Sequence, residues 1–236
     1  MRTPRAARTD GLFDQEKGNH MLIDRIDALI EERDLLTHPF YVKWTAGTLP
    51  RENLLEYARQ YYAFESYFPR CISAIHARTP QREVRQALLD NLWDEEHGDA
   101  NHAELWLRFA EALGAPRTEV LGALPKPTTQ ELVETYRSIA AEAPVGAAVA
   151  ALYAYERQVP AVAQAKIAGL RAFYGISDGP GLEFFETHSS LDVGHAAAER
   201  QIVEDLGQED QETVVEVSAA ALDAWWRFLD GIDAEA

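Results

Sequence analysis

From residue 21 onward, apolar side chains recur every three or four positions, which is the period of an amphipathic helix. Short stretches rich in Gly and Pro separate the periodic segments, and no alternating strand pattern lies between them. We therefore predict an all-α protein, folded as a single-domain bundle of seven to eight helices. The periodic segments are 22–36, 51–77, 81–97, 101–113, 129–141, 145–173, 180–206 and 209–232.

The first twenty residues do not share this pattern. They are polar, carry arginines near the start, and contain no apolar core of the length found in a secretory signal. We expect residues 1–20 to form a disordered extension and residues 21–236 to form the folded domain. The single Cys71 allows no intramolecular disulfide and fits a reducing compartment, so we predict a cytoplasmic protein.

The charge balance restricts the partners. The chain of 236 residues has a net charge of −17, and no basic stretch lies outside its N-terminus. Nucleic acid and anionic membrane surfaces are therefore not expected as partners. No run of apolar residues is long enough to span a bilayer. A homodimer is compatible with these properties.

The segment HSSLDVGH contains a pattern typical of metal ligands. His188, Asp192 and His195 follow one another at positions i, i+4 and i+7, which places them on one stripe of a helix. The segment DEEHGDANH repeats the same offsets with Glu95, Asp99 and His102.

A third helix adds a lone acidic residue, Glu156, within a strongly apolar stretch. A carboxylate there is costly unless it is paired or bound to a metal. Carboxylates and histidines from facing helices form dinuclear sites in helical bundles. Iron and manganese accept this mixture of ligands, while the lack of cysteine clusters disfavours structural zinc.

Spacing alone leaves simpler interpretations open. The HSSLDVGH stripe could be a solvated or hydrogen-bonded face, and the DEEHGDANH group could lie at the surface. Glu156 could pair with Arg157 or Lys166. Compatible ligands on three helices nevertheless favour a metal site. Cys71 and the histidines without such company are interpreted as structural; these are His20, His38, His76 and His97.

Four segments carry a more specific signal. They read HPFYVKWTAGTLPRENLLEYARQYYAFESYFPRCISAIHAR, LLDNLWDEEHGDANHAELWLRFAEALG, ALYAYERQVPAVAQAKIAGL and THSSLDVGHAAAE. In their order and spacing the chain resembles the family of the chlamydial protein associating with death domains, which belongs to the haem-oxygenase-like dimetal oxidases. The resemblance extends over residues 21–232, nearly the whole chain.

The resemblance implies a haem-oxygenase-like fold and a dinuclear Fe/Fe or Mn/Fe centre that activates O₂ with electrons from an external reductant. Asp99 does not match a ligand position of the family, so the symmetry of the two histidine-containing segments is only partial. The implied ligands are Glu95, His102, Glu156, His188, Asp192 and His195.

The resemblance also implies an activity. Members make 4-aminobenzoate for folate synthesis from their own side chains, and here Tyr41 matches the sacrificed tyrosine and Lys166 the amino donor. Tyr155 matches a further tyrosine near the site, whereas Phe184 stands where the family pattern has another tyrosine. We expect Lys166 on the same helix as Glu156, about 15 Å further along its axis.

Other functions remain open at this stage. The same fold could oxidise a separate small molecule, or the protein could bind a partner. A death-domain partner is not expected, because the chain shows neither a secretion signal nor an obvious docking patch. Tyr41 could also be a core residue with a hydrogen-bonded hydroxyl.

Overall fold

The computed structural model describes residues 10–205 and 211–234, and these residues form helices with no strand. The all-α prediction is confirmed, but the described residues contain ten helices of eleven residues or more, rather than seven to eight. The helices are α1 (Asp10–Glu32), η1 (Leu35–Thr37), α2 (Pro39–Thr45), α3 (Arg51–Glu65), α4 (Phe68–Arg78), α5 (Arg82–Glu96), α6 (His102–Leu113), α7 (Arg117–Leu121), α8 (Pro127–Glu142), α9 (Val145–Glu156), α10 (Val159–Phe173), α11 (Pro180–Glu204) and α12 (Gln211–Asp233).

The higher helix count comes largely from two breaks that the apolar period conceals. The segment 51–77 divides into α3 and α4, and the segment 145–173 divides into α9 and α10. Pro69 and Pro160 lie in the first turn of α4 and α10. A proline fits this position but cannot continue a preceding helix, because it lacks an N–H group and its ring meets the carbonyl four residues earlier.

The N-terminal helix starts earlier than the apolar pattern indicates. Helix α1 begins at Asp10, upstream of the expected start at Met21. Of residues 1–20, which we expected to form a disordered extension, 10–20 belong to α1 and 1–9 lie outside the described residues. No described helix is both long and apolar enough to span a bilayer.

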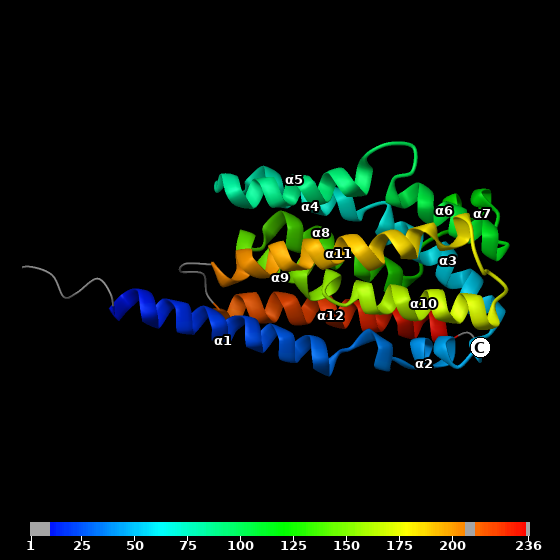
Figure 1. Cartoon of the computed structure of the whole chain (residues 1–236), viewed down its shortest axis with the longest axis horizontal. Coiled ribbons are helices and arrows are strands. Elements are labelled where there is room, and N and C mark those ends of the chain that lie inside the picture. Colours follow the sequence, from blue (N-terminus) through cyan, green and yellow to red (C-terminus); the bar gives the residue numbers. More distant parts are fainter. Residues whose placement is uncertain (1–9, 206–210, 235–236) are drawn as a thin grey trace, which may run out of the picture.

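Helix α9 lies at the centre of the bundle. Every residue from Gly146 to Glu156 is buried, as expected for a helix that is apolar on all sides. In Figure 1 the pair α4 and α5 lies along one edge, α1 and α2 lie along the other, and α9 and α11 run between them. This arrangement brings the end of α9, the middle of α11 and the α5–α6 junction to one buried region.

Candidate metal centre

Helix α11 carries the HSSLDVGH stripe into the core. His188 and Asp192 are buried, and the His195 side chain is only 11% exposed. The three residues therefore do not form a solvated helix face. The His195 Nδ1 atom lies 3.5 Å from Asp192 Oδ1 and 3.8 Å from Glu156 Oε2. Its Nε2 atom lies 3.1 Å from Oδ2 of Asp94.

The DEEHGDANH segment does not form one helix. Helix α5 ends at Glu96 and α6 begins at His102, with Gly98 between them at a φ of 81°. Asp99 therefore lies in the connection and is exposed, so the proposed stripe of Glu95, Asp99 and His102 is wrong. Glu95 and His102 are nevertheless buried together, with Glu95 Oε2 3.0 Å from His102 Nδ1.

A carboxylate that the sequence interpretation missed completes this second group. Glu65, His102 and His188 each offer one ligand atom, and these atoms lie within 4.8 Å of one another. The rings of His102 and His188 have centroids 4.3 Å apart. Three different helices, α3, α6 and α11, thus bring a buried Glu/His/His group together that could hold a metal ion.

Glu156 does not pair with Arg157 or Lys166. Its two oxygens accept hydrogen bonds of 2.9 and 3.2 Å from the Asn91 side-chain amide. Arg157 is exposed, and the Lys166 Nζ atom donates a hydrogen bond to the Tyr57 hydroxyl instead. Glu156 is therefore oriented by a neutral donor and lacks a cationic partner from those two side chains.

Three of the buried carboxylates share a position that favours a bound cation. Glu65 and Glu156 are the last residues of α3 and α9, and Glu95 lies in the last turn of α5. The C-terminal end of a helix carries a partial negative charge, which repels a carboxylate and attracts a cation. Three helix C-termini and three carboxylates therefore create a negative electrostatic potential in the buried region around Glu65, Glu95 and Glu156, which favours a bound cation.

The protonation equilibria reflect this crowding. Burial raises the pKa of Glu65 and Glu95 well above the ordinary range, and raises that of Glu156 to about 8. Burial lowers the pKa of His102 and His188. In the described structure Glu65 Oε1 makes no hydrogen bond, and the contact between Glu95 Oε2 and His102 Nδ1 lacks hydrogen-bond geometry. A divalent cation would stabilise deprotonated carboxylates and neutral imidazoles together, so the donor set fits iron or manganese.

His195 differs from the other two histidines. Burial lowers its pKa, but contact with Asp192 and the charge of Glu156 outweigh that effect and raise the pKa to about 9. Without a metal, an imidazolium at this position would offset part of the carboxylate charge. A metal ion held by His195 and the carboxylates would take over that role.

A chamber of aromatic side chains lies beside His188. It encloses a cavity of about 20 Å³. The Lys166 Nζ atom donates to the Tyr57 hydroxyl at 2.7 Å, and the Tyr41 hydroxyl lies 3.3 Å from the same oxygen. Nζ also lies 5.6 Å from the centroid of the Tyr41 ring. Lys166 is on α10 rather than on the helix of Glu156, so the estimate of its position along one straight helix is wrong.

Tyr155 and Phe184 form the chamber wall nearest the metal group. The hydroxyls of Tyr155 and Tyr61 are 2.6 Å apart, and the Tyr155 ring stacks on Trp225 at 4.6 Å. The Phe184 ring lies 4.1 Å from the ring of His188. Phe184 therefore brings an apolar ring and no hydroxyl to this wall of the chamber.

Besides Glu65, the sequence interpretation missed Glu199, and it assigned no particular role to Tyr57 and Tyr61. Tyr57, Tyr61 and Glu65 repeat at i, i+4 and i+8 on α3, and Glu199 follows His195 by four positions on α11. These spacings were visible, but a tyrosine or a single acidic residue on a helix carries no metal signature by itself.

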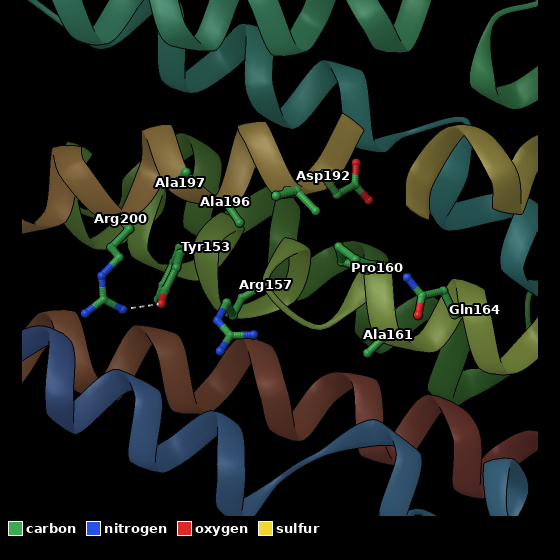
Figure 2. A pocket seen from close by; sticks show the side chains of 10 residues that line it. Tyr153, Arg157, Pro160, Ala161, Gln164, Asp192, Ala196, Ala197 and Arg200 are labelled. Atoms are coloured by element: carbon green, nitrogen blue, oxygen red, sulfur yellow. Dashed lines mark hydrogen bonds between the residues drawn. The ribbon is translucent and has the colours of Figure 1, made fainter. Parts of the chain in front are cut away.

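A separate and larger pocket has a volume of about 460 Å³ and is lined from α9, α10 and α11. Figure 2 shows the side chains that line it. Arg200 donates a hydrogen bond of 2.9 Å to the Tyr153 hydroxyl at one end of it (Figure 2). Asp192 lies at its edge, and its carboxylate points away from Arg157 and Arg200 (Figure 2). This pocket therefore lies behind the metal-binding face of α11.

Comparison with known proteins assigns the fold and the relatives. Residues 55–226 match a family described as iron-containing redox enzyme. The 4-aminobenzoate synthase of Nitrosomonas europaea is 43% identical over 219 residues, covering 88% of this chain and 89% of the relative. The 4-aminobenzoate synthase of Chlamydia muridarum is 40% identical over 208 residues, covering 88% of each.

A solved structure from Shewanella denitrificans, described as a domain of unknown function with a haem-oxygenase-like fold, superposes with a TM-score of 0.76. It is 18% identical and covers 92% of both chains. The haem-oxygenase-like fold is thereby confirmed, and the two synthases confirm the family expected from the sequence motifs.

Proposed function

This chain belongs to the family of iron-containing redox enzymes, and we propose that it makes 4-aminobenzoate from its own Tyr41 and Lys166 in an O₂-dependent reaction. The names of its relatives support the product, which would serve folate synthesis. The observation that carries the proposal is the position of the Lys166 amine, which lies over the Tyr41 ring inside a closed chamber.

The metal centre of this proposal is dinuclear, Fe/Fe or Mn/Fe. When bound, the metals supply O₂ activation, with electrons from an external reductant. Glu65 lies against His102 and His188 and would add a carboxylate on that side. The residues that would hold the metals are Glu95, His102, Glu156, His188, Asp192 and His195.

Lys166 is suited to act as a nitrogen donor. It is 4% exposed, and burial lowers its pKa to about 7. A large fraction of the amine is then neutral at neutral pH, so its lone pair is available. The Tyr57 hydroxyl fixes the amine at 2.7 Å and holds it against the aromatic wall.

Tyr41 is suited to lose an electron and a proton together. Burial raises the pKa of its phenol far above neutrality, so the group keeps its proton until it is oxidised. The Tyr57 hydroxyl, 3.3 Å away, would take that proton only while passing its own to the neutral amine of Lys166, 2.7 Å further on. Tyr57 would therefore serve both reacting residues as a positioning residue.

The volume of the chamber favours an internal substrate. Pockets that bind small molecules usually have about 300–1,000 Å³, whereas this cavity has about 20 Å³. A separate substrate would have to displace side chains that are already packed. Oxidation of an added small molecule is the competing function, and it predicts many turnovers per chain.

The experiment combines isotope labelling with substitution. Protein carrying ring-deuterated tyrosine is loaded with iron and manganese, reduced and exposed to O₂, and the product is analysed by mass spectrometry. We expect labelled 4-aminobenzoate from the parent and none from Tyr41→Phe, with metal content and helix content retained. Tyr136→Phe is the matched control, because Tyr136 is equally buried but does not line the chamber; its hydroxyl accepts a hydrogen bond from Trp225. Unlabelled product from labelled protein would refute the proposal.

The remaining expectations on partners are part of this proposal. We propose a cytoplasmic protein that can form a homodimer and that takes O₂ and electrons from a reductant, without a nucleic-acid, membrane or death-domain partner. Size-exclusion chromatography with light scattering measures the oligomeric state.

A further inference from the structure

Glu199 is a further buried acidic residue next to the centre, and the proposed reaction gives it no role. Glu199 is 3% exposed, and in the part of the chain that the structure describes neither of its carboxylate oxygens makes a hydrogen bond. The charges that influence it most are those of Glu156 and Asp192. A buried carboxylate without a partner is costly, so its presence requires an explanation.

A pocket of about 300 Å³ connects Glu199 with the surface. Its rim is formed by exposed residues of α5 and α11, including Asp90 and Gly194. Its floor is formed by Asn91, His195 and Glu199. Among these, Asn91 bonds to Glu156, and His195 contacts both Asp192 and Glu156. The pocket therefore reaches the ligands from outside, whereas the aromatic chamber reaches them from inside.

The walls of this pocket suit the passage of a small hydrated ion. Ala87, Gly194 and Ala198 leave the opening unobstructed, and Asp90 adds negative charge at the rim. Negative charge at the mouth of a pocket attracts cations and accelerates their entry. Oxygen donors without strong partners can replace the water ligands of an entering ion one at a time.

We propose that this pocket is the entry route for the divalent metal ions and that Glu199 is a transient ligand that passes each ion to Glu156, Asp192 and His195. The inference rests on the metal centre of the proposed function. It assigns to Glu199 a kinetic role: the ion binds it during loading and leaves it once the centre is filled.

The test measures the kinetics of metal binding rather than product formation. Metal-free protein is mixed with Co²⁺ in a stopped-flow instrument, and binding is followed by the visible absorbance of the ion. Release is measured by mixing the loaded protein with excess chelator. We expect Glu199→Gln to slow uptake by at least about tenfold, the lower end of the effect of an oriented charge on association, and to keep the final stoichiometry. Glu186→Gln, an exposed position on the same helix, is the charge control.

A second variant blocks the pocket without changing charge. Gly194 is exposed, and a Cβ atom built there meets no atom within 4 Å, so Gly194→Leu fits the fold and narrows the opening. An obstruction on a route slows entry and exit equally, so both rates should fall while the dissociation constant stays unchanged. Gly194→Ala is the control and should bind like the parent.

Three results would overturn the entry route. These are unchanged uptake in Glu199→Gln, a loss of stoichiometry in that variant, which would make Glu199 a permanent ligand, and unchanged rates in Gly194→Leu. Failure of the parent protein to bind Co²⁺ would instead refute the metal centre itself, so the two proposals fail in different ways.

Discussion

Replacement of Lys166 by Met should stabilise the metal-free protein, and the gain should depend on pH. Burial lowers the pKa of Lys166 from 10.5 to about 7. Each pKa unit corresponds to about 1.4 kcal/mol, so a charged ammonium in this chamber costs roughly 5 kcal/mol. The Tyr57 hydrogen bond is worth about 1 kcal/mol, and its loss leaves a net gain of roughly 4 kcal/mol.

The sign follows from proton binding. Between pH 7 and 10.5 the unfolded chain holds the Lys166 proton and the folded chain has released it. The parent protein therefore gains stability from this group as pH rises through that window. The advantage of Lys166→Met should be greatest at pH 7 and below, and should disappear as pH approaches 10.5.

Urea unfolding of both proteins at several pH values measures the difference in free energy of unfolding. All other titrating groups are shared, so most of their contribution cancels in the difference. Lys43→Met is the control, because Lys43 is partly exposed and paired with Asp233, and its variant should show no such gain. A Lys166→Met protein that is less stable at every pH, or a difference that does not vary with pH, would refute the reasoning.

Four further predictions concern the centre and the chamber. His188→Ala should lose most of the metal measured by elemental analysis, with an unchanged far-UV spectrum. Glu65→Gln should weaken metal binding by about 10–100-fold in a competition titration. Loss of a group that supports metal ligands typically lowers metal affinity by this factor. Tyr57→Phe should keep the metal but lower the product yield, measured by mass spectrometry, because Lys166 loses its hydrogen bond. In the parent, the single-turnover rate should fall about tenfold per pH unit below 7, as the neutral form of Lys166 is lost.

The sequence predicted the helical class because the apolar period repeats throughout the chain. It did not reveal the breaks before α4 and α10, since Pro69 and Pro160 occupy first-turn positions where the apolar pattern continues past them. One consequence was the misplacement of Lys166, which a straight helix would have carried away from the centre. The break instead turns α10 so that Lys166 faces Tyr41 and Tyr57.

The candidate site was predicted in part, for a geometric reason. Spacing identifies neighbours on one helix, as for His188, Asp192 and His195, but it contains no information on which helices face each other. Glu65 can be recognised as a candidate ligand only from the structure, because α3 ends beside His102 of α6 and His188 of α11. Glu199 is of interest because it lines a pocket, and a pocket cannot be predicted from a local sequence pattern.

The tight packing of Tyr41 has a consequence for the life of the protein in the cell. Its ring is 3% exposed and touches the rings of Phe40 and Trp44. If the ring leaves as product, the core keeps a void, and the loss of a buried aromatic side chain costs about 3–5 kcal/mol. This is a large share of the roughly 5–15 kcal/mol that holds a typical domain folded. A chain that has reacted would unfold more often and be removed by proteases. The supply of product would then be set by the rate at which ribosomes make new chains, and the reaction itself would mark each used chain for degradation.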